Sequence, residues 1–145
     1  MKIYIATDHA GFELKNRLKE FLQSNNYDVE DCGALVFDSL DDYPDFILPA
    51  AKKVSENKNS KGIILGGSGQ GEAMAANRIK GVRAIVYYGG PKEIVKLSRM
   101  HNNANIISFG ARFVSFEQAV EVLKIWLSEE FEGGRHEARI NKLDV

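Results

Sequence analysis

Short apolar runs alternate along this chain with longer segments in which apolar residues recur at helical spacing. The runs expected to form strands are residues 2–6, 27–30, 62–65, 82–87 and 104–108. Helices are expected over residues 14–22, 44–54, 71–79, 92–100 and 119–127. Strands that alternate with helices are typical of βαβ units. The pattern therefore predicts an α/β protein, a three-layer α/β/α Rossmann-like domain around a five-stranded parallel sheet.

Residues 1–145 show no internal repeat, low-complexity stretch or linker, so we expect a single domain. The pair Gly133-Gly134 is the one late break. It separates a short basic tail, residues 135–145, from the preceding helical pattern.

Charge and cysteine content narrow the class of protein. The formal net charge is -1, which disfavours nucleic acid and anionic membrane as partners. Cys32 is the only cysteine, so no disulfide forms within the chain, as is usual in a reducing compartment. The N-terminal residues turn polar after six positions, and no apolar run is long enough to span a bilayer. We expect a cytoplasmic protein.

The predicted fold indicates where a ligand binds. In open parallel sheets, ligands lie beyond the carboxyl ends of the strands. The segments that follow strand ends are residues 7–11, 66–72, 88–91 and 109–112.

The glycine-rich segment 66–72 joins an expected strand to an expected helix. Its sequence is Gly66-Gly67-Ser68-Gly69-Gln70-Gly71-Glu72. Such a loop with a helix N-terminus can hold a phosphate or a developing oxyanion, although a tight turn alone would also use glycine. Glu72 stands where a dinucleotide fingerprint has its third glycine, and no Lys-Ser/Thr pair follows, so neither that fingerprint nor a P-loop is present.

Several polar residues near these segments have two interpretations. Glu72 is either a helix-dipole residue or a general base, and His101 is either a helix C-cap or an acid. Asp8 is either an N-cap or a partner in proton transfer, and Tyr43 either a core aromatic or a substrate contact. Arg135 and Arg139, four residues apart, either form a solvated basic tail or bind phosphate.

Five motifs in order resemble the family of type B ribose-5-phosphate isomerases, which includes allose- and galactose-6-phosphate isomerases. They are residues 7–12 (TDHAGF), 42–45 (DYPD), 66–78 (GGSGQGEAMAANR), 101–105 (HNNAN) and 133–140 (GGRHEARI). The resemblance covers nearly the whole chain. It implies an aldose–ketose isomerase that needs neither metal nor organic cofactor, and the histidines show no recognisable metal-ligand spacing.

One departure from the family pattern bears on the mechanism. Many members carry a catalytic cysteine where this chain has Gly66, and a threonine where it has Ser68. A second branch has Gly-Gly-Ser-Gly-Asn-Gly-Glu and is understood to use the glutamate as base. This chain resembles that branch, with Gln70 in place of asparagine, so the resemblance implies Glu72 as the base and leaves Cys32 without a catalytic role.

The remaining roles are expected partly from the resemblance and partly from the chemistry of the reaction, which needs a base and donors to a developing oxyanion. The expected catalytic residues are Glu72, His101 for ring opening, Ser68 and Asp8. Substrate-binding residues are His9, Tyr43, Gly67, Gly69, Gln70, Gly71, Asn102, Arg112, Arg135 and Arg139, of which His9 and the two tail arginines resemble the phosphate-binding set. In the family the site lies between two subunits, which implies a homodimer, or a dimer of dimers, with residues 133–145 packing on a partner.

Three alternatives stay open at this point. The substrate is either ribose 5-phosphate or a six-carbon sugar phosphate, because the motifs do not set pocket length. A nucleotide-binding regulatory module is another class that uses doubly wound sheets. A catalytically inactive homologue is the third, since the usual cysteine is missing.

Overall fold

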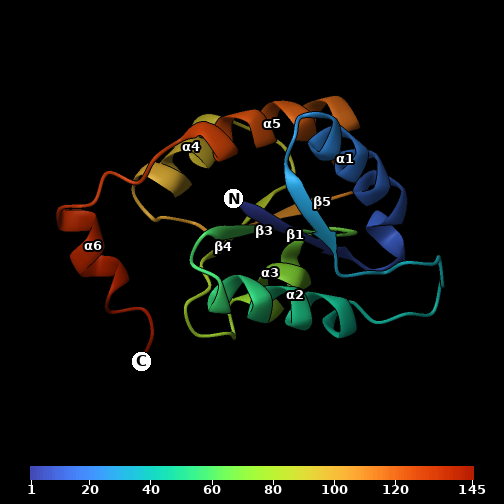
Figure 1. Cartoon of the computed structure of the whole chain (residues 1–145), viewed down its shortest axis with the longest axis horizontal. Helices are drawn as coiled ribbons and strands as arrows, with labels where there is room; N and C mark the ends of the chain where they lie inside the picture. The colour runs from blue at the N-terminus through green and yellow to red at the C-terminus, as the bar shows by residue number, and fades with distance from the viewer.

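The computed structural model describes residues 1–145, and a parallel five-stranded sheet runs through its middle (Figure 1). The strands are β1 (Lys2–Thr7), β2 (Asp28–Asp31), β3 (Ser60–Gly66), β4 (Ala84–Tyr87) and β5 (Ile106–Gly110). Their spatial order is β2-β1-β3-β5-β4, and every neighbouring pair is parallel. The predicted three-layer α/β/α architecture is confirmed.

Helices cover both faces of the sheet (Figure 1). They are η1 (His9–Gly11, a 3₁₀ turn), α1 (Phe12–Ser24), α2 (Pro44–Glu56), α3 (Gln70–Ala76), α4 (Glu93–Met100), α5 (Phe116–Ser128) and α6 (Arg135–Ile140). The helices α1, α4 and α5 lie on one face, and α2 and α3 lie on the other. Two apolar cores result, one on each face, because strands covered on both sides bury residues of both orientations.

Most elements begin or end within a few residues of the predicted positions, and asparagine residues explain three of the differences. The helix expected over residues 71–79 ends at Ala76, because the Asn77 side chain exchanges two hydrogen bonds with the backbone of Ala84. The fourth strand begins at Ala84 instead of residue 82. The fifth begins at Ile106 instead of residue 104. It follows Asn103 in a left-handed conformation (φ 47°) and Asn105, whose Oδ1 accepts a hydrogen bond from the N–H of Arg83 (2.7 Å).

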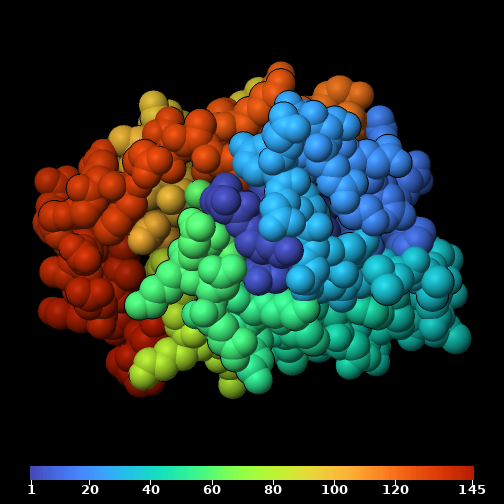
Figure 2. Space-filling model, in the orientation of Figure 1, coloured from blue at the N-terminus to red at the C-terminus, as the bar shows by residue number.

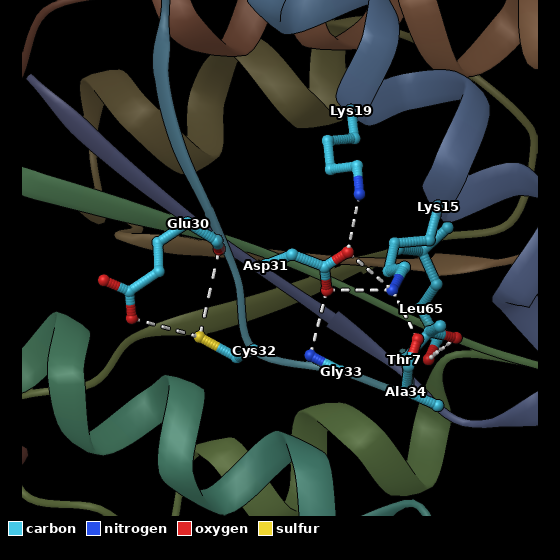
Figure 3. Close-up of polar contacts among 9 residues, drawn as sticks. All are labelled: Thr7, Lys15, Lys19, Glu30, Asp31, Cys32, Gly33, Ala34 and Leu65. Atoms are coloured by element: carbon cyan, nitrogen blue, oxygen red, sulfur yellow. Dashed lines mark hydrogen bonds and ion pairs between the residues drawn. The ribbon is translucent and has the colours of Figure 1, made fainter. Parts of the chain in front are cut away.

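A buried lysine ties α1 to the end of β2 (Figure 3). Lys15 is fully buried, and its Nζ donates to both carboxylate oxygens of Asp31 (2.8 and 2.9 Å) and to the carbonyl of Ala34 (2.6 Å). Asp31 also accepts from Lys19 and from the N–H of Gly33. Burial by itself would raise the pKa of Asp31, but these hydrogen bonds outweigh it and lower the pKa.

This network fixes the backbone beside the first strand's carboxyl end. The N–H of Thr7 donates to Gly33 (2.8 Å), and the N–H of Ala34 donates to Thr7 (2.7 Å). The hydroxyl of Thr7 donates to the carbonyl of Leu65 on β3 (3.0 Å). Asp8, the next residue along the chain, is therefore held against a rigid frame.

The C-terminal helix α6 stands apart from the three layers (Figure 1). None of its residues is buried, and Leu143 beyond it is 62% exposed. The helix includes both Arg135 and Arg139, which lie four residues apart in the sequence. No helix of the protein combines the length and the apolar character needed to cross a membrane.

Candidate active site

The carboxyl end of β3 leads through the glycine loop into α3, and Glu72 lies in the first turn of that helix. Its side chain is almost fully buried (5% exposed). Burial raises the pKa of Glu72, the nearby Asp8 charge raises it further, and a backbone hydrogen bond opposes both. Such a carboxyl group, basic yet shielded from water, is suited to proton abstraction.

Gly66 makes room for the Glu72 carboxyl group. A Cβ atom built on Gly66 would lie 1.6 Å from Oε1 of Glu72 and 2.0 Å from its Cδ. The space that a side chain at position 66 would fill is therefore the space that the carboxyl group occupies. A cysteine at position 66 and Glu72 in this position exclude each other, which gives a steric reason for the pairing seen in the sequence.

Two other glycines of the loop leave space for polar side chains from other parts of the chain, Arg112 and Tyr43. A Cβ at Gly67 would lie 3.0 Å from Nη1 of Arg112, and one at Gly71 would lie 2.7 Å from the hydroxyl of Tyr43. Tyr43 is half-buried, with its ring against the α2-side core and its hydroxyl at the loop.

The loop conformation rests on its pairing with β5. Gly69 precedes α3 in a left-handed conformation (φ 80°), and its carbonyl accepts from the buried hydroxyl of Ser108 (2.7 Å). Ser68 is exposed, and its Oγ accepts from the N–H of Gln70 (3.3 Å). Ser68 and the N–H groups at the start of α3 thus lie together beside Glu72.

His9 and Asp8 complete this edge from the first strand. Nδ1 of His9 lies 2.7 Å from Oδ1 of Asp41, which also accepts from the N–H of His9 (3.0 Å). The hydrogen bond to Asp41 is the main cause that raises the pKa of His9, with a smaller contribution from Asp8 and opposition from burial and Arg112. A raised pKa favours the protonated, cationic imidazole, which suits contact with a phosphate.

Asp8 is itself largely buried (7% exposed) and accepts a hydrogen bond from the N–H of Ala10 (3.0 Å). It is the N-cap of the 3₁₀ turn η1, whereas Gly11 precedes α1, so Asp8 does not cap the first long helix directly. Its charge is close enough to Glu72 to influence the pKa of that residue.

A second group of predicted residues lies at the opposite edge of the sheet. Helix α4 returns from the end of β4 to the start of β5, so His101, its C-cap, lies beside the amino ends of the strands. Asn102 is exposed there and lines a shallow recess of about 340 Å³ with the C-terminal segment. Arg135 and Arg139 lie exposed on α6, on the same side of the sheet. One chain therefore does not bring these four residues to Glu72.

The amino-edge group is held together by two histidines and a glutamate. The rings of His101 and His136 stack with centroids 4.3 Å apart. Oε2 of Glu132 lies 3.9 Å from Nε2 of His101 and 3.5 Å from Nε2 of His136. Burial lowers the pKa of His136, and the nearby His101 and Arg135 lower it further.

Each of two clusters brings together three residues that could bind a metal ion, although their spacing in the sequence does not indicate a metal site. One is His101, Glu132 and His136, and the other is Asp8, His9 and Asp41. Their members come from separate parts of the chain, so only the fold brings them together. Hydrogen bonding and ion pairing already account for the arrangement of both clusters, and we assign no ion to them.

Sequence reasoning missed Asp41, Glu132 and His136. Asp41 lies just before the Asp42–Asp45 motif, and its Oδ2 is buried without a hydrogen-bond partner while its Oδ1 holds His9. In the sequence, only its position next to this motif could have pointed to Asp41. The contacts of Glu132 and His136 depend on how the tail folds back, which spacing does not reveal.

Comparison with known proteins assigns the chain to a family. Residues 3–143 match the family model described as Ribose/Galactose Isomerase. A probable ribose-5-phosphate isomerase B from Mycoplasma genitalium is 40% identical over 97% of this chain and 92% of its own length. Ribose-5-phosphate isomerase B from Mycobacterium tuberculosis is 38% identical over 99% of this chain and 88% of its own.

Solved structures agree with the sequence relatives. The crystal structure of ribose-5-phosphate isomerase B from Mycoplasma genitalium with bound ribulose-5-phosphate superposes with a TM-score of 0.93, at 40% identity, over 98% of this chain and 93% of the other. The resemblance inferred from the five motifs is thereby confirmed, and this chain belongs to the ribose/galactose isomerase family.

Proposed function

We propose that this protein interconverts ribose 5-phosphate and ribulose 5-phosphate, with Glu72 as the base. The observation that carries the proposal is the buried Glu72 carboxyl group in the space left by Gly66, with its pKa raised. Relatives named ribose-5-phosphate isomerase B, over nearly their full length, favour the five-carbon substrate over allose or galactose 6-phosphate. They also favour an enzyme over a nucleotide-binding regulatory module.

The reaction moves a proton between adjacent carbons through an enediolate. Glu72 takes the proton from the carbon next to the carbonyl group and returns it to the neighbouring carbon. The negative charge that develops on oxygen is stabilised by the Ser68 hydroxyl and the N–H groups of Gly67, Gly69, Gln70 and Gly71. These residues supply both proton transfer and oxyanion stabilisation without a further group.

Cationic groups around the glycine loop bind the phosphate. His9 is held by Asp41 and favours its protonated form, and Arg112 lies over Gly67 on the same edge. Tyr43, whose hydroxyl reaches the loop at Gly71, contacts a sugar hydroxyl. Together they hold the two ends of the substrate on either side of Glu72.

The site is completed by a second copy of the chain. His101, Asn102, Arg135 and Arg139 lie at the amino edge of the sheet, away from Glu72 of the same chain. A helix that buries none of its residues is unusual in a folded chain, and packing α6 on a partner explains it. A two-fold dimer then carries two equivalent sites, each with its base from one subunit and its tail arginines from the other.

In this arrangement His101, at the C-terminus of α4, acts as the acid that opens the sugar ring. Asp8, beside Glu72, is its proton-transfer partner across the interface. The single free cysteine, half-buried Cys32, fits a cytoplasmic enzyme. Burial raises the pKa of the Cys32 thiol to about 11, so it is not a nucleophile at neutral pH.

An assay of ribulose 5-phosphate formation from ribose 5-phosphate tests the activity. We expect turnover with ribose 5-phosphate and weaker turnover with allose 6-phosphate. No isomerisation of any sugar phosphate would show an inactive homologue. Preference for a six-carbon substrate would instead make the protein an allose- or galactose-6-phosphate isomerase.

Subunit mixing tests the shared site. An Arg139→Ala chain and a Glu72→Gln chain, each nearly inactive alone, are mixed under conditions that exchange subunits. In the heterodimer one site collects both changes and the other has neither, so activity returns in part. If mass spectrometry shows that subunits have exchanged and no activity returns, then residues 133–145 bind substrate in the site of their own chain, and the shared-site arrangement is wrong.

A further inference from the structure

A recess at the amino edge of the sheet is separate from the proposed catalytic and substrate-binding residues. Its volume is about 530 Å³, within the range of small-molecule sites. It lies between the α2–β3 turn at residues 57–61, the loop at residues 103–105 and the segment that follows α5, and these segments surround it in Figure 2. None of the proposed catalytic or substrate-binding residues lines it.

Positive charge dominates the lining. Lys58, Lys61, Arg83 and Arg99 face the recess, against Glu130 as the only carboxylate among the lining residues. No carboxylate lies within ion-pair distance of any of these four cations. A group of unpaired cations in a partly dehydrated recess favours binding of an anion.

The two arginines are fixed in place, with donors to spare. Arg99 is 6% exposed; its Nε donates to the carbonyl of Glu129 (3.3 Å), and its Nη1 donates to Asn103 (3.0 Å) and Ala104 (2.6 Å). Arg83 donates from Nε to the carbonyl of Asn103 (2.8 Å) and from Nη1 to that of Gly81 (3.2 Å). Each leaves Nη2 without a partner in the chain. These bonds orient both guanidinium groups before a ligand arrives, which reduces the entropy lost on binding.

The cations also act on one another. Burial lowers the pKa of Lys61 and the nearby Arg99 lowers it further, whereas Glu130 opposes both. Burial likewise lowers the pKa of Arg99. The nearby Glu130 raises this pKa, and the nearby Arg83 lowers it. An anion between them would relieve this repulsion and the loss of hydration together.

We propose that this recess binds a phosphorylated small molecule with at least two anionic groups, held by Lys58, Lys61, Arg83 and Arg99 at the sheet edge opposite Glu72. The volume exceeds what a single phosphate needs, and planar guanidinium groups suit phosphate oxygens. The site is a second ligand site, independent of the sugar phosphate that reacts.

The test uses the full-length protein, with pyrophosphate as the probe. Backbone amide NMR shifts report where it binds, and calorimetry gives the affinity at each site. We expect shifts at residues 57–61, 83 and 103–105. The double variant Lys58→Gln/Lys61→Gln should weaken binding at these residues by about tenfold or more. Lys58 is exposed, whereas Lys61 is partly buried with its Nζ 5.9 Å from the ring centroid of Trp126. Thermal unfolding without ligand therefore checks that the variant folds, and the single variant Lys58→Gln, which should also weaken binding, leaves the Trp126 contact intact.

Two variants separate this site from others. Lys52→Gln removes the same charge from α2 outside the recess, where the side chain is 69% exposed, and should leave the affinity unchanged. Arg139→Ala should leave the recess shifts intact, because that arginine belongs to the proposed catalytic site. Shifts confined to the glycine loop and tail, or equal affinity in the double lysine variant, would overturn the proposal.

Discussion

The placement of Glu72 depends on the missing side chain at Gly66, and Gly66→Ala tests that dependence with a single methyl group. The new Cβ would lie 1.6 Å from Oε1 of Glu72, whereas ordinary contact begins at 3.4 Å. The carboxyl group must therefore move by about 2 Å, and a misplacement of about 1 Å can cost a hundredfold in rate. Gly66 does not have a positive φ, so alanine brings no backbone strain of its own.

We expect Gly66→Ala to lower kcat for ribose 5-phosphate by about a hundredfold or more, with KM changed little. The assay is initial rates of ribulose 5-phosphate formation, with circular dichroism as a check on folding. Combining Gly66→Ala with Glu72→Gln should add little to the loss in Glu72→Gln alone, since both act on the same group. Near-normal kcat in a folded Gly66→Ala protein, or fully multiplicative losses in the double variant, would refute this reasoning.

Three further predictions follow from individual contacts. Glu72 acts as a base only when it is deprotonated, and its pKa is raised, so kcat/KM should begin to fall on acidification at a pH above the usual pKa of glutamate. Asp8→Asn removes a neighbouring negative charge and should shift this acid limb of the pH–rate profile to lower pH. Lys15→Met should lower the free energy of unfolding by about 3 kcal/mol in urea titrations at pH 7. The loss should shrink as the pH falls from the usual pKa of aspartate through the lowered pKa of Asp31, where protonation of Asp31 removes the pair in the unaltered protein as well. His101→Asn should slow isomerisation of cyclic ribose 5-phosphate more than exchange of the C1 proton of open-chain ribulose 5-phosphate in D₂O; equal slowing would remove its ring-opening role.

The Lys15 and Asp8 predictions have further checks. Lys19→Met removes a partly exposed partner of Asp31 and should cost less than about 1 kcal/mol. An Asp8→Asn protein whose acid limb stays in place would show that this charge does not act on Glu72. A Lys15→Met protein as stable as the unaltered chain would show that the buried pair contributes nothing net.

The periodicity of apolar residues was sufficient to predict the sheet, its five strands and its helical layers. Short apolar runs and apolar residues at helical spacing are features of the local sequence, so they can be recognised without tertiary information. The boundaries at Ala76, Ala84 and Ile106 were displaced because Asn77, Asn103 and Asn105 make side-chain contacts over distances that no local pattern encodes.

The site was predictable in part, for a physical reason. Parallel strands bring their carboxyl ends to one edge, so the association of Asp8, His9 and Glu72 follows from topology. The steric exclusion between Gly66 and the Glu72 carboxyl group does not, because it depends on the rotamer of a buried side chain. The separation of His101 from Glu72 follows from the same topology, because α4 leads to the amino end of β5.

The most direct test of the central claim is the turnover of ribose 5-phosphate by Glu72→Gln beside Cys32→Ser. Glutamine keeps the size of Glu72 and removes the base, so kcat should fall by about two to four orders of magnitude while substrate binding, followed by calorimetry, changes little. Cys32→Ser should turn over at the normal rate, because its half-buried thiol takes no part. Near-normal turnover in Glu72→Gln, or loss of activity in a folded Cys32→Ser protein, would contradict the assignment of Glu72 as the base.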